Sequence, residues 1–141
     1  MCQLHQSYIE KSNANWDCVE RLMSDKNRFA DVIASRMYYS MFLLVKCSMV
    51  YNQENNVDCD AMMKMSPDAS TQEHKLAKKC ISYLNHDIGM EFSDLYDLRI
   101  TADYDIAHVD NTELEDAYNC WKQRHQDWVN NLQSANPRLI L

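Results

Sequence analysis

The segment 37-MYYSMFLLV-45 is the most apolar stretch of the chain, and Ser40 is its one residue outside the hydrophobic set. A helix on the surface of a globule is apolar on one face, whereas a helix that is apolar nearly all round is covered from several sides. Apolar residues continue at spacings of three and four on both sides of the segment. This pattern predicts one long central helix from an N-cap at Asp25 to about Tyr51.

The composition determines what surrounds that helix. The chain has 141 residues with only one Gly and two Pro, and 46% of its residues are hydrophobic. So few glycines and prolines leave little material for tight hairpin turns, which argues against a β-sandwich, a barrel or a glycine-loop nucleotide fold. The length suits one domain, residues 1–141, and the predicted fold class is all-α.

The periodicity predicts two helices on the N-terminal side of a break at Gly89, besides the central one. A loose apolar stripe predicts the first at 4–23. Ser70 and Glu73 form a capping box, which predicts another from there to about Asn85. The polar stretch 53–70 between the central helix and this one is predicted to be a long loop with one turn at 61–65.

Two more helices are predicted beyond Gly89. The first has a core stripe at spacings of three and four, and the second starts at a capping box formed by Thr112 and Glu115 and runs to about residue 135, because Pro137 blocks its continuation. The whole is predicted to be an antiparallel up-and-down bundle of four to five helices. The stripe consists of Phe92, Leu95, Leu98, Ala102, Ile106 and Val109.

Six cysteines are spread singly along the chain, without a C-x-x-C pair or any spacing typical of zinc or a disulfide framework. The first ten residues lack the features of a signal peptide, and no segment reaches the length of a membrane span. We therefore expect a cytoplasmic protein that does not contact a membrane. The histidines lack the Glu-x-x-His pairs of a di-iron bundle, so no metal and no cofactor are expected.

Charged residues beside the apolar stripes are the candidates for function. Arg36 precedes the apolar segment by one residue, and Asp103 follows Arg99 by one helical turn, with Tyr104 next to it. One interpretation is a structural network in which Arg36 contacts Asp103 and tyrosine hydroxyls such as that of Tyr39 between two helices. The other is a polar site in which Arg99 binds phosphate with its planar guanidinium.

A second group of cations lies on the helix predicted at 70–85. Lys75, Lys78 and Lys79 share one face at helical spacing. Such a face could meet RNA phosphates, or it could be a solvated surface. Because the net charge is -7, any nucleic-acid contact has to use a local basic patch of this kind.

Two motifs resemble those of a known family. The segment 34-ASRMYYSMF-42 resembles the R-x-YY-(A/S)-x-F helix of HEPN domains (higher eukaryotes and prokaryotes nucleotide-binding), and 98-LRITADY-104 resembles their later R-x-x-ADY helix. His74 falls where a histidine often begins the helix between them. The resemblance runs from about Val19 to Asn131, with both motifs in the family's order.

This resemblance implies an up-and-down bundle that forms a homodimer and takes part in toxin–antitoxin or defence modules. The best-understood members of the family are metal-independent endoribonucleases, and many have a minimal nucleotidyltransferase as antitoxin partner. Their catalytic signature is an arginine followed after four to six residues by a histidine. Here Tyr104, Asp105 and Ile106 stand at those positions. The resemblance thus carries over Arg99 as the phosphate-facing catalytic candidate, with Tyr104 beside it, and carries over no histidine.

Two functions follow as hypotheses. In the first, the chain acts on RNA or binds it through a cleft at the dimer interface that contains Arg99. In the second, it is a non-catalytic interaction subunit that partners a nucleotidyltransferase, and its polar core is purely structural.

Overall fold

The computed structural model describes residues 3–53, 69–105 and 108–134, and all of its regular elements in these ranges are helical. The all-α fold class is therefore confirmed. The elements, in chain order, are α1 (Gln3–Leu22), the short 3-10 helix η1 (Met23–Asp25), α2 (Lys26–Gln53), α4 (Ala69–Leu84), α5 (His86–Tyr104) and α6 (Asn111–Gln133).

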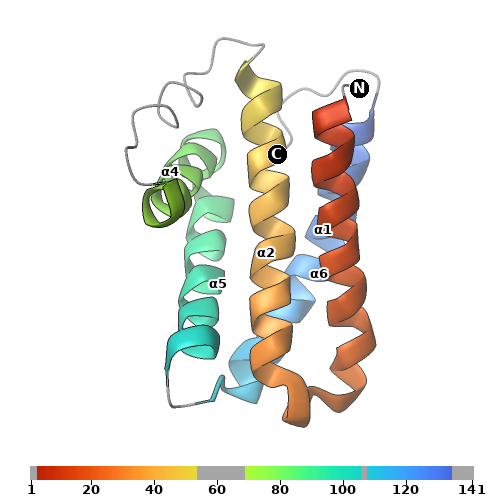
Figure 1. The fold of residues 1–141 in the computed structure, drawn as a ribbon, viewed down its shortest axis with the longest axis vertical. Helices are drawn as coiled ribbons and strands as arrows, with labels where there is room; N and C mark the ends of the chain where they lie inside the picture. The colour runs from red at the N-terminus through yellow and green to blue at the C-terminus, as the bar shows by residue number, and fades with distance from the viewer. Residues whose placement is uncertain (1–2, 54–68, 106–107, 135–141) are drawn as a thin grey trace.

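Helix α2 occupies the middle of the molecule (Figure 1), with α1 on one side, α5 on the other and α6 behind. These four long helices run alternately down and up, so the predicted bundle topology is confirmed. Helix α4 is shorter and lies across the upper part of α5, where it also contacts α2.

The central position of α2 explains its composition. The helix packs against α1, α5, α6 and α4, and within its segment 37–45 Met37, Tyr38, Met41 and Leu44 have no exposed surface. The helix starts with a kink, because Phe29 has non-helical backbone angles of φ -114° and ψ 19°. The prediction that this helix is buried on several sides is confirmed.

The two helices after α4 begin differently from the sequence prediction. Asn85 caps α5 by accepting a hydrogen bond from the backbone N–H of Ile88 (3.1 Å), so the helix starts before Gly89. Asp110 caps α6 by accepting from the N–H groups of Thr112 and Glu113 at 2.8 and 3.1 Å. The predicted break at Gly89 and the predicted cap at Thr112 are therefore wrong. Instead, an asparagine four residues before Gly89 and an aspartate two residues before Thr112 cap the two helices.

Gly89 instead marks a close approach between helices. A Cβ added there would lie 2.1 Å from the Oγ of Ser82 and 2.6 Å from its Cα. The second distance involves backbone, so a neighbouring rotamer change cannot make room for a methyl group. Gly89 thus lets α5 pack directly on α4.

Some predictions need adjustment and others fall outside the described residues. Val109 is buried, as expected of a stripe residue, but α5 ends at Tyr104 and Val109 lies beyond the helix. Cys80 takes part in a disulfide, which the isolated cysteine spacing did not predict, while the thiols of Cys18, Cys47 and Cys120 form no disulfide. The loop turn predicted at 61–65 and the stripe position Ile106 lie outside the described residues.

Candidate functional site

Arg99 lies near the C-terminal end of α5, and only 8% of its surface is exposed. Its Nε is 2.9 Å from Oδ2 of Asp103, one turn further along the helix. Its Nη2 donates a hydrogen bond to the hydroxyl of Tyr39 on α2 (2.9 Å) and a longer one to the hydroxyl of Tyr104 (3.5 Å). We name these four residues, Arg99, Asp103, Tyr39 and Tyr104, the Arg99 cluster.

Aromatic rings surround the guanidinium of this cluster. Its carbon Cζ lies 5.7 Å from the ring centre of Tyr38 and 5.4 Å from those of Tyr39 and Tyr104. At these distances a cation is attracted by the ring face. Tyr38 is fully buried, whereas 72% of Tyr104 is exposed, so the guanidinium lies at the border between the core and the solvent.

The charge and the free donor of Arg99 matter for binding. Burial would lower its pKa, but the electrostatic influence of Tyr39, Tyr104 and Asp103 outweighs burial and raises the pKa above its usual value. The contact with Asp103 is an ion pair without an aligned hydrogen bond. Among the described residues the third nitrogen, Nη1, has no hydrogen-bond partner and is not buried. The cluster therefore offers a permanent positive charge with donors left over.

Arg36 does not contact Asp103, so that part of the predicted network is wrong. Its Nη1 donates to the side-chain oxygen of Asn15 on α1 (3.2 Å), and its guanidinium lies 5.3 Å from the ring centre of Tyr39. Asp103 is taken by Arg99 on its own helix, because residues one turn apart meet without any bridge between helices. Arg36 joins the cluster only through the Tyr39 ring.

Two other contacts tie α2 to the cluster. Ser35 donates a hydrogen bond to Oδ2 of Asp103 (3.4 Å), and Tyr39 accepts the one from Arg99. The link predicted between these two helices thus exists, with Ser35 and Tyr39 in place of Arg36. Nothing in the sequence distinguished Ser35 from the other small residues of α2.

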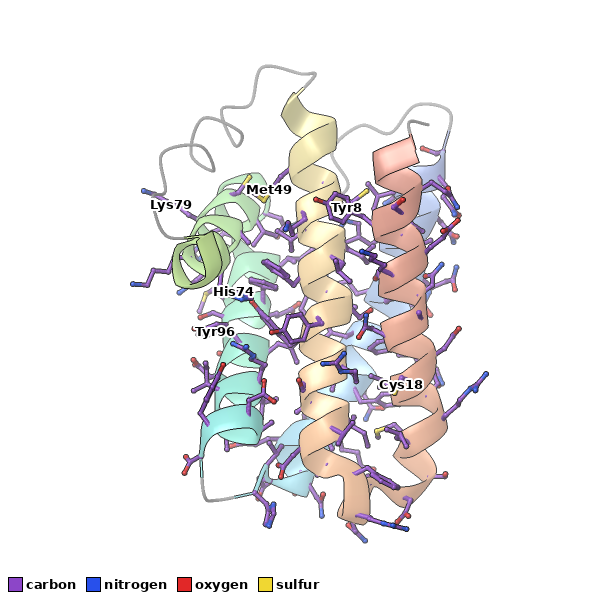
Figure 2. The ribbon with its side chains drawn as sticks, in the orientation of Figure 1. Tyr8, Cys18, Met49, His74, Lys79 and Tyr96 are labelled. Carbon is purple, nitrogen blue, oxygen red and sulfur yellow. The ribbon has the colours of Figure 1, made fainter. Side chains whose placement is uncertain are left out.

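His74 is a further polar group that the sequence located only by resemblance. Its Nδ1 is hydrogen-bonded to the hydroxyl of Tyr38, and its ring packs on Phe42 with centroids 4.4 Å apart. Figure 2 shows His74 and Tyr96 beside α2. The Tyr38 ring contacts both the imidazole of His74 and the guanidinium of Arg99. The hydroxyls of the adjacent tyrosines 38 and 39 thus hydrogen-bond to different helices, α4 and α5. The tyrosine pair was the feature of the sequence that could have indicated contacts to two helices.

The three lysines of α4 lie apart from this site. Lys75, Lys78 and Lys79 are exposed and make no hydrogen bond or ion pair with any described residue. Figure 2 shows Lys79 pointing away from the bundle. The structure does not bring these lysines into the Arg99 cluster.

A second polar cluster is closed inside the bundle. Nε2 of His125 is 3.1 Å from Oγ of Ser12, and that oxygen is 3.1 Å from Oγ of Ser40. The imidazole stacks on the Trp16 ring with centroids 5.1 Å apart. Burial lowers the pKa of His125 to about 4, against the smaller opposite influence of nearby carboxylates. We name Ser12, Ser40 and His125 the His125 cluster.

The remaining geometry bears on metals and membranes. Within the described ranges no three His, Cys, Asp or Glu side chains come together as a metal site. None of the helices described is both long and apolar enough to cross a membrane.

His108 is 2.8 Å from Asp31, and the pKa of Asp31 lies below its usual value. Burial would raise this pKa, but hydrogen bonds from Val109 and His108 lower it by more.

Comparison with known proteins gives one relative. A curated protein of Methanocaldococcus jannaschii, named as a putative toxin, is 29% identical to this chain over 100 residues. The match covers 71% of this chain and 61% of the relative, so the chain spans less than two thirds of that protein. No family model matches the sequence, and no solved structure matches it.

Proposed function

We propose that the chain is a HEPN-like toxin of a prokaryotic toxin–antitoxin or defence module, directed at RNA through the Arg99 cluster. The two sequence motifs support the family, and the archaeal relative named as a toxin supports the role. The observation that carries the proposal is the exposed Tyr104 ring beside a guanidinium that keeps an unoccupied nitrogen.

This arrangement fits the two parts of a nucleotide. A guanidinium binds phosphate oxygens through charge-assisted hydrogen bonds, and Nη1 of Arg99 has donors to give. Single-stranded RNA bases stack on exposed aromatic rings, and Tyr104 offers such a ring. Phosphate bound to Arg99 with a neighbouring base stacked on Tyr104 therefore accounts both for the free nitrogen and for the exposed ring.

Arg99 also suits a role in cleavage. A guanidinium stabilises the negative charge that develops on a phosphate when the ribose 2'-hydroxyl attacks it. A homodimer that brings two Arg99 clusters together would supply two guanidinium groups to one cleft. We propose this homodimer, with a nucleotidyltransferase as antitoxin partner, and expect light scattering at micromolar concentration to give twice the chain mass. A monomeric mass would contradict the cleft.

Expression of the chain alone tests the proposed role. We expect growth arrest with the natural sequence, and relief of the arrest by Arg99→Ala and by Tyr104→Ala. Arg21→Ala is the matched control, because Arg21 is an exposed arginine at the end of α1. Its expression should still arrest growth.

RNA binding by the purified protein tests the site directly. Fluorescence anisotropy with a labelled single-stranded RNA should show about tenfold weaker binding for Arg99→Ala, with a salt dependence reduced by about one phosphate contact. Circular dichroism shows whether each variant is folded. Folded Arg99 and Tyr104 variants that still arrest growth and bind RNA would overturn the proposal. A natural chain that neither arrests growth nor binds RNA would leave the non-catalytic interaction subunit as the function.

A further inference from the structure

A groove follows the seam between α5 and α6. Its larger part is a hollow of about 480 Å³ lined by both helices, and a second hollow of about 340 Å³ continues along the same pair. Cys120 lines both hollows. The ion pair between Arg124 and Glu91 (2.8 Å) joins the two helices beside the groove. The groove thus follows the length of two neighbouring helices.

The walls of the larger hollow are acidic. Five carboxylates line it, and no lysine, arginine or histidine does. Asp94, Asp97 and Asp116 are exposed, and none of these three has a hydrogen bond or ion pair with a described residue. Carboxylates gathered around one hollow repel one another, and a cationic ligand relieves this repulsion. The two other carboxylates belong to Glu91 and Glu113.

The floor of the same hollow is apolar. Leu95, Leu98, Ala117 and Trp121 line it, and Leu98 and Ala117 remain partly exposed. An apolar floor between charged walls is what an amphipathic helix requires: its apolar stripe is buried and its flanking cations meet the carboxylates. RNA is disfavoured here, because its phosphates would face five carboxylates.

We propose that this α5–α6 groove binds a basic amphipathic helix of a partner protein. The occupant carries a stripe of leucine-like side chains flanked by lysine or arginine on both sides. A second copy of this chain suits the groove poorly, because its net charge is -7. The proposal does not depend on the RNA-directed role, since the Arg99 cluster lies outside the lining of both hollows.

A synthetic helix tests the proposal. The probe is a labelled peptide of about 18 residues, five turns of helix, built from Leu, Ala and Lys with the leucines on one face. Fluorescence anisotropy should show saturable binding to the full chain that weakens as salt screens the charges. A scrambled peptide of the same composition, which has the charge without the stripe, should bind at least about tenfold more weakly because it cannot use the apolar floor.

Matched charge reversals locate the binding. The double variant Asp94→Lys with Asp97→Lys should weaken the peptide at least about tenfold through repulsion in the groove. The control, Glu10→Lys with Asp25→Lys, changes the net charge equally at exposed positions on α1 and η1, and should keep the affinity within about threefold.

Cys120 gives a readout within the groove itself. Bound peptide should slow alkylation of Cys120, which lines both hollows, and leave the rate at Cys18 on α1 unchanged. Mass spectrometry follows both thiols in one sample.

Several results would overturn the proposal. They are equal binding of the scrambled peptide, equal loss in the groove and control variants, and unprotected Cys120. A natural dimer that dissociates in the Asp94, Asp97 double variant would also overturn it, because a second copy would then occupy the groove.

Discussion

The two polar clusters of this bundle differ in how they are completed. In the His125 cluster Ser12 and Ser40 donate their hydroxyl protons to each other's backbone carbonyls at 2.8 and 3.0 Å, which leaves Oγ of Ser12 to accept a hydrogen bond from Nε2 of the neutral imidazole. In the Arg99 cluster a permanent charge lies at the edge, with an exposed ring beside it. The His125 cluster has no hydrogen-bonding group left for a ligand, whereas the Arg99 cluster has a free donor.

This difference separates stability from function. Buried polar groups that are fully paired hold helices in register. Removal of one partner leaves the other without a hydrogen bond and lowers the free energy of unfolding. A charged group that keeps a free donor at the border between core and solvent can exchange water for a ligand there. We therefore expect changes in the His125 cluster to act on folding alone, and changes in the Arg99 cluster to act on RNA binding as well.

Acid should act most strongly, through His125. The folded protein keeps this imidazole neutral down to about pH 4, while the unfolded chain takes up a proton below its usual pKa of 6.5. The stability is therefore fully present above pH 6.5 and is lost as the pH falls towards 4. A shift of this size contributes about 3 kcal/mol to the free energy of unfolding. Urea denaturation at a series of pH values measures it.

The matched control for acid is His125→Gln, which keeps a side-chain amide near Ser12 and does not titrate. Its stability should change with pH much less than that of the natural chain between pH 6.5 and 4, while carboxylate effects common to both proteins cancel. Parallel pH curves for the two proteins would show that His125 does not carry the sensitivity.

Loss of the Arg99 side chain should have an intermediate effect on stability. Arg99→Ala removes the partner of Tyr39 and of Asp103, which we expect to cost about 2 kcal/mol. Arg36→Ala should cost about 1 kcal/mol, because its partner Asn15 is partly exposed and can bond to water. Only the Arg99 variant should lose RNA affinity. Equal losses of affinity would place Arg36 in the site as well.

Loss of the Tyr104 side chain should have the smallest effect on the free energy of unfolding and a clear effect on RNA affinity. Tyr104→Ala should change the free energy of unfolding by less than about 0.5 kcal/mol, because the ring is mostly exposed. Its RNA affinity should fall about tenfold through lost stacking, and Tyr104→Phe should keep most of that affinity. Thermal denaturation and anisotropy measure the two quantities. Equal binding by the Ala and Phe variants would exclude stacking.

The fold was predictable from sequence where the signal is long. The apolar segment 37–45 and the stripes around it fix helix number and order, since burial dominates the energy of such elements. Helix ends were less predictable. Asn85 and Gly89 are both plausible markers of the start of α5, and Asp110 and Thr112 are both plausible caps of α6. The two candidates for each helix lie only a few residues apart.

The candidate site was predictable only in part. Arg99 and Asp103 are one turn apart on a single helix, so the pattern alone places them side by side. Contacts between helices depend on how the helices pack, which is why Arg36 was assigned the wrong partner and Ser35 was missed. The acidic groove is spread over two helices distant in sequence, and neither helix shows it alone.

The close approach at Gly89 bears on how the chain reaches its fold. Because α5 packs directly on α4 across a one-residue connection at Asn85, these helices form a pair that is local in sequence, as do α1 and α2. Contacts between neighbours in sequence require little loop closure, and helical proteins dominated by them fold within microseconds to milliseconds. Assembly from two preformed pairs would bring Tyr39 and Arg99 together only at the end, when the pairs dock through α2 and α5.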